Sequence, residues 1–99
     1  MDLPIACNLD AEQLQDRLAE LKAIGRTSLR RVERTSQRAR LRFARADAVR
    51  ERLDEIVEAE SRCCAFMDFE LSEAGDEIVM TISVPEGAEP VLAEFVAAF

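Results

Sequence analysis

Histidine, tryptophan and tyrosine are absent from this sequence of 99 residues. Without histidine, neither a Cys/His zinc site nor a Cys-His catalytic dyad can form. Cysteine is scarce, with Cys7, Cys63 and Cys64 only, and no Cys-x-x-Cys knuckle of a structural zinc ribbon is present. No apolar run is long enough to cross a bilayer, and the N-terminus lacks a basic region followed by an apolar one. We therefore expect an intracellular, cytoplasmic protein without a membrane partner.

The composition is that of a soluble globular protein, with 48% hydrophobic and 33% charged residues. The length allows one hydrophobic core, so residues 1–99 are interpreted as a single domain. Three cysteines is an odd number, and a domain of this size can fold without disulfides. We therefore expect reduced thiols, which are available as metal ligands or nucleophiles.

The charge is distributed unevenly along the chain. A net charge of −7 argues against a nucleic-acid partner, because phosphate binding is driven by cationic surface. Residues 26–52 nevertheless contain 10 arginines and three acids, a balance of +7, so the remainder carries −14. The basic segment would suit an anionic partner, but we favour pairing between the two parts within the fold.

Three segments have the apolar spacing of amphipathic helices. The first is expected to run to about Ile24 and to end at Gly25, because glycine is favoured just after a helix end. The second is expected from Asp47 to about Arg62. Pro90 opens the third, whose apolar face consists of Leu92, Phe95, Val96 and Phe99.

The segments between these helices have the pattern of strands. Residues 38–43 alternate Arg38, Arg40 and Arg42 with apolar side chains, and residues 78–84 alternate inward apolar side chains with the outward Val79, Thr81 and Ser83. Leu29 and Val32 are out of phase, which indicates a bulge or a short edge strand, and residues 66–71 form the remaining strand. The order α-β-β-α-β-β-α predicts an α+β fold, a four-stranded antiparallel sheet with helices on one face.

Two assignments concern side chains of these strands. The basic face of Arg38, Arg40 and Arg42 is expected to meet solvent, or Asp68 and Glu70 of a neighbouring strand. The phenylalanines, Phe66 among them, are assigned to the core. Neither group requires a ligand.

Two charged residues interrupt the apolar faces of the first two helices. Arg17 lies between Leu14 and Leu21, and Glu60 continues the stripe that begins at Val49. Arg17 alone would extend along the edge of its stripe towards solvent. An unpaired buried carboxylate costs several kcal/mol, however, and opposite charges in such positions usually pair. We therefore predict an Arg17–Glu60 contact, which either fixes helix packing or supports a site.

The stripe that contains Glu60 leads on to Cys63 and Cys64. Thiolates are preferred ligands of soft ions such as mercury, arsenite, copper(I) and zinc. Cys7 would complete a three-thiol site if the N-terminal segment crosses near the end of the second helix. Glu60 would act there as an oxygen ligand or proton acceptor, and Arg17 would keep it ionised or lower a thiol pKa. The structural alternative is that the cysteines are small buried hydrophobes, which we favour for Cys7 taken alone.

The segment Glu60-Ser61-Arg62-Cys63-Cys64-Ala65-Phe66 resembles small, mostly uncharacterised bacterial proteins that carry a Glu-x-x-Cys-Cys motif before an aromatic, apolar segment. A cysteine ahead of an arginine-containing helix, matched here by Cys7 and Arg17, is also common among them. Ala65 and Met67 stand where proline and leucine are expected. The resemblance implies an association with heavy-metal handling.

The leading hypothesis is therefore binding of a thiophilic metal or metalloid ion by Cys63 and Cys64, for sequestration, delivery or sensing. Cys7 is the candidate third ligand, and Glu60 and Arg17 are the supporting residues. A second hypothesis is a redox protein or enzyme in which one thiolate is a nucleophile and the other resolves it. A third is a non-catalytic interaction module, for example a homodimer through its hairpins, whose cysteines only pack.

Overall fold

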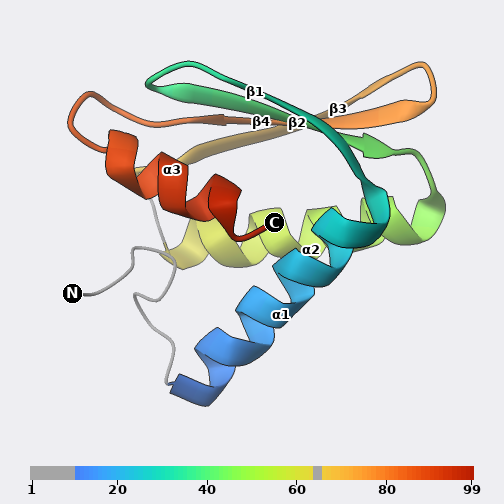
Figure 1. Cartoon of the computed structure of the whole chain (residues 1–99), viewed down its shortest axis with the longest axis horizontal. Helices are drawn as coiled ribbons and strands as arrows, with labels where there is room; N and C mark the ends of the chain where they lie inside the picture. Colours follow the sequence, from blue (N-terminus) through green and yellow to red (C-terminus); the bar gives the residue numbers. More distant parts are fainter. Residues whose placement is uncertain (1–10, 64–65) are drawn as a thin grey trace.

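The computed structural model describes residues 11–63 and 66–99, with side chains for residues 15–62 and 66–99. Its elements are α1 (Ala11–Ser28), β1 (Leu29–Arg34), β2 (Arg38–Ala44), α2 (Asp47–Cys63), β3 (Asp68–Ala74), β4 (Glu77–Ser83) and α3 (Glu89–Ala97). Their order is the predicted α-β-β-α-β-β-α. The helices lie on one face of the sheet and leave the other face uncovered (Figure 1).

The four strands form one antiparallel sheet in the order β1-β2-β4-β3. Each hairpin pairs strands adjacent in sequence, and the sheet is joined in the middle by β2 and β4. Ala39 is opposite Ile82, and Phe43 is opposite Ile78. Because directly opposite residues share a face, the apolar sets of the two central strands point together towards the helices.

The core lies between the central strands and the helices, as the alternating pattern predicts. Its fully buried side chains include Leu21 and Ile24 of α1, Leu53 and Ile56 of α2, Leu92 and Phe95 of α3, Leu41 and Phe43 of β2, and Met80 and Ile82 of β4. Phe99 meets both Phe43 and Phe95 edge to face, with ring centroids 5.8 and 5.3 Å apart. These contacts fix α3 against the sheet.

The prediction that the first helix ends at Gly25 is wrong. Gly25 is buried within α1, which continues to Ser28. A Cβ atom at Gly25 would collide with the backbone carbonyl of Phe99. The glycine is therefore explained by the close approach of the C-terminal residue to the helix, and not by a helix end.

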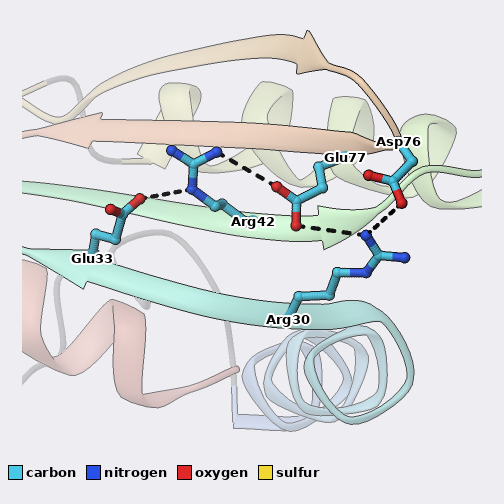
Figure 2. A network of polar contacts seen from close by, with 5 residues as sticks. All are labelled: Arg30, Glu33, Arg42, Asp76 and Glu77. Carbon is cyan, nitrogen blue, oxygen red and sulfur yellow. Dashed lines mark hydrogen bonds and ion pairs between the residues drawn. The ribbon is translucent and has the colours of Figure 1, made fainter.

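The edge strand β1 contains the predicted bulge, a shift of register between Leu29 and Arg31. Beyond the half-buried Leu29, every residue of β1 is exposed. Ion pairs link this strand to the rest of the sheet (Figure 2). They run from Glu33 to Arg42 (2.7 Å), Arg42 to Glu77 (3.5 Å), Glu77 to Arg30 (3.6 Å) and Arg30 to Asp76 (3.0 Å).

Charge pairing between the basic segment and the rest of the chain is thus confirmed. Glu73 of β3 also meets Arg45 at 2.8 Å and Arg50 at 2.9 Å. Apart from Glu33–Arg42, which lies within the basic segment, each of these pairs joins an arginine of the basic segment to an acid of the β3–β4 hairpin.

Two side-chain assignments require correction, and the first concerns the basic face of β2. Strand β4 lies between β2 and β3, so Asp68 and Glu70 are not on a strand next to Arg38, Arg40 and Arg42. Arg42 pairs instead with Glu33 and Glu77, whereas Arg38 and Arg40 are exposed, as the alternative assignment expected.

The second correction concerns Phe66, which is 43% exposed and not part of the core. It lies in the turn between α2 and β3, and the strand begins only at Asp68.

The helices that the structure describes include none with the length and apolar character needed to cross a membrane.

Candidate functional site

Glu60 lies in the last turn of α2 with its side chain inside the protein. Together with Leu53 and Ile56 it occupies the face of the helix that points into the core, and all three are at most 1% exposed. This is the position that the apolar spacing predicts. Glu60 is the only fully buried charged side chain among the described residues. Its burial needs an explanation, because a carboxylate loses its hydration there.

Arg17 supplies one partner. Its Nη1 donates a hydrogen bond of 2.6 Å to Oε1 of Glu60, which joins α1 to α2 across 43 residues of sequence. The Arg17 side chain is 18% exposed, so the cation sits at the rim of the buried site. The predicted contact is confirmed, and Arg17 does not simply extend into solvent.

The second carboxylate oxygen of Glu60 is different. Oε2 is buried and has no hydrogen-bond partner among the described residues. Burial raises the pKa of the Glu60 carboxyl above its ordinary value, although the charge and hydrogen bond of Arg17 act in the opposite direction. The site therefore contains a carboxyl group that holds a proton more strongly than an exposed one, and one of its oxygens meets no donor in the part of the chain that the structure describes.

The cysteine pair follows this carboxyl along the chain. Cys63 is the last residue of α2, three positions after Glu60, and helix positions three apart are neighbours on the same face. The backbone thus brings the start of the Cys63-Cys64 pair within one turn of Glu60. The Cys63 side chain, Cys64 and Cys7 lie outside the described residues, so their predicted meeting stays a prediction.

The described part of the chain contains no group of three or more cysteine, aspartate or glutamate side chains arranged to hold a metal ion. Arg17 and Glu60 form an ion pair whose Oε2 has no donor within residues 15–62 and 66–99, an arrangement suited to taking a proton or a hydrogen bond from a neighbouring group.

Sequence reasoning missed a feature of the uncovered sheet face. A hollow of about 220 Å³ lies there, lined by Arg38, Arg40, Asp68, Phe69, Glu70, Thr81 and Ser83. A second hollow of about 320 Å³ is lined by Glu33, Arg34, Thr35, Arg38 and Arg40. The alternating arginines of β2 indicate a basic strand face. The strand order, which they do not give, places the acids of β3 on the other side of the hollow.

Comparison with protein-family models, with curated proteins and with solved structures found no match for this chain. The Arg17–Glu60 pair provides the geometry, and the adjacent Cys63-Cys64 sequence provides the reactive groups.

Proposed function

We propose that this protein binds a thiophilic metal or metalloid ion through Cys63 and Cys64, with Cys7 as a third ligand. It would act as a sequestering, delivery or sensing module in the cytoplasm. The observation that carries the proposal is the buried Glu60 carboxyl, whose Oε2 lacks a partner among the described residues, one helical turn before the cysteine pair.

A purely structural role does not explain why a carboxyl group is buried at Glu60. An unsatisfied buried polar atom costs about 1–3 kcal/mol, and an apolar residue would continue the α2 stripe without this cost. A functional role accounts for the open oxygen, because a ligand or proton would occupy it. The positive charge of Arg17 at 2.6 Å keeps the ionised form accessible despite burial.

The chemistry of soft ions explains why such a carboxyl belongs beside thiols. A cysteine binds a metal as its thiolate, so binding releases a proton. Glu60 would accept that proton, or hydrogen-bond a water or hydroxide on the ion, while Arg17 limits the accumulation of negative charge. Mercury, arsenite, copper(I) and zinc are the candidate ions, since each binds sulfur ligands. The resemblance to Glu-x-x-Cys-Cys proteins associated with heavy-metal handling points in the same direction.

The test is native mass spectrometry of the reduced protein with each of the four ions. Wild type is compared with Cys7→Ser, Cys63→Ser and Cys64→Ser. We expect one tightly held ion that is lost when either member of the pair is replaced, and weakened when Cys7 is replaced. Retention of none of the four ions, or retention unchanged without Cys63 and Cys64, would overturn the proposal.

The role of Glu60 has a matched control in the same helix. Glu58 is exposed and pairs with Arg62 at 2.8 Å on the surface. We expect Glu60→Gln to weaken ion binding by about 10–100-fold, as for residues that support metal ligands, and Glu58→Gln to leave it unchanged. Equal effects of the two substitutions would remove Glu60 from the site.

The two other hypotheses predict different results for the same protein. A protein that retains no ion but has a thiol of depressed pKa and peroxide sensitivity would be a redox protein. Slow thiol labelling in the native state, again without an ion, would indicate cysteines that only pack.

A further inference from the structure

The uncovered face of the sheet carries separated charges of opposite sign. Two rows of directly opposite residues cross it from β2 over β4 to β3, namely Arg38–Ser83–Asp68 and Arg40–Thr81–Glu70. Members of a row lie on the same face of the sheet. None of the four charged residues has an ion-pair partner within the described part of the chain.

The strand order keeps these charges apart. Neighbouring strands are about 4.8 Å apart, so β4 separates β2 from β3 by roughly 10 Å. The short side chains of Thr81 and Ser83 lie between, among the residues that line the hollow of about 220 Å³. One side of this hollow is cationic and the other is anionic.

This charge pattern disfavours a partner whose charges are all of one sign. A polyanion attracted by Arg38 and Arg40 would meet Asp68 and Glu70 about two strands away, and a polycation would meet the arginines. A fitting partner presents both signs at the same spacing. A second copy of this chain does so.

We propose that two copies associate through their uncovered sheet faces, related by a two-fold axis parallel to the strands. This axis places β2 of one copy towards β3 of the other. Arg38 then meets Asp68 of the second copy, Arg40 meets its Glu70, and the symmetry repeats both contacts. A two-fold axis perpendicular to the strands in the same plane would stack β2 on β2 and bring like charges together, which disfavours it.

The small area of the overlapping faces indicates a weak dimer. With this axis the strands β2, β4 and β3 of the two copies overlap, and three strands of about seven residues cover roughly 14 by 23 Å, or about 650 Å² buried in total for two copies. This is below the standard size of specific interfaces, and its contacts are polar. The dimer is therefore weak and loses affinity as salt screens the charge pairs. It does not depend on the cysteines or on ion binding.

Charge reversal tests the proposal, with association measured by sedimentation velocity at low ionic strength. We expect wild type to dimerise reversibly and to dissociate in 0.5 M salt, about the range where charges are strongly screened. Arg38→Glu/Arg40→Glu and Asp68→Arg/Glu70→Arg should each weaken self-association at least about 100-fold, because like charges then face each other. A mixture of the two variants should form a heterodimer. One chain with all four reversals should dimerise again.

Two control variants distinguish this interface from association through another surface or through the thiols. Arg52→Glu reverses an exposed charge on α2, away from the sheet, and should leave the dimer intact. Cys63→Ser should also leave it intact, so failure of the metal proposal and failure of this one are distinguishable. A wild type that stays monomeric at low salt, or four reversals that do not restore the dimer, would overturn the inference.

Discussion

The guanidinium of Arg17 and the carboxyl of Glu60 form a 2.6 Å ion pair that joins α1 to α2 at positions where both helices otherwise present apolar side chains. Arg17→Met should destabilise the protein by about 2–4 kcal/mol, because it leaves the buried Glu60 carboxyl unpaired. The loss is reduced because the Arg17 side chain lies partly in solvent. Urea unfolding measures the change. Arg62→Met, which removes an exposed pair with Glu58 in the same helix, should cost less than about 1 kcal/mol.

The double variant Arg17→Met/Glu60→Leu distinguishes loss of pairing from loss of packing. Replacing both partners with apolar residues of similar size should recover most of the stability lost in Arg17→Met. A double variant that is less stable than the single one would show that the pair itself stabilises the helix contact.

Burial of Glu60 predicts a pH dependence of stability. Its pKa is raised above the ordinary 4.5, so the native state holds this proton more tightly than the unfolded state. The free energy of unfolding should therefore fall as pH rises from about 4.5 through the raised pKa, and the loss is complete above it. Glu60→Gln cannot titrate and should lack this decline, whereas Glu58→Gln should retain it.

The comparison is made as a difference between wild type and variant across pH. Glu33 and Asp76 have pKa values lowered by ion pairs with arginines, and they give a slope of the opposite sign at lower pH. This slope is common to all three proteins and cancels. Parallel stability curves for wild type and Glu60→Gln between pH 4.5 and about 8 would contradict a raised pKa.

Gly25→Ala tests the contact between α1 and the C-terminal residue. Alanine normally stabilises a helix interior by up to about 1 kcal/mol relative to glycine. Here the added Cβ collides with the Phe99 backbone, and overpacking costs about 1–3 kcal/mol. We expect a net loss of about 1–2 kcal/mol in urea unfolding, with Lys22→Ala at an exposed position of α1 nearly neutral. A stabilised Gly25→Ala protein would contradict the close approach.

The fold is largely predictable from sequence because its signals are local. Alternation in β2 and β4, the 3.6-residue spacing in α2 and the turn between the β3–β4 strands each depend on neighbours in sequence. The prediction for Gly25 fails because its reason is a contact with Phe99, 74 positions further along the chain. A glycine required by tertiary approach looks the same in sequence as a glycine at a helix end.

The candidate site is predictable in part for a similar reason. Arg17 and Glu60 each break an apolar stripe, which is a local signal, and burial leaves each charge few partners other than the opposite one. The strand order is not a local property, so the sequence pattern matched Arg38 and Arg40 with acids on a strand that is not their neighbour. The sequence pattern also does not identify the ion, because adjacent thiols suit several soft ions equally.

The ion pairs of β1 predict where the sheet opens first. Beyond Leu29 this edge strand contributes no buried side chain, so its attachment depends on backbone pairing with β2 and on the pairs made by Arg30 and Arg42. Arg42→Met should accelerate amide hydrogen exchange across β1 much more than in β4, because it frees Glu33 without touching the core. Arg40→Met, on the same face of β2 but without an ion pair among the described residues, is the control, measured at concentrations that keep the chain monomeric. Equal acceleration in the two variants, or faster exchange spread evenly over the sheet, would show that backbone pairing alone holds the strand.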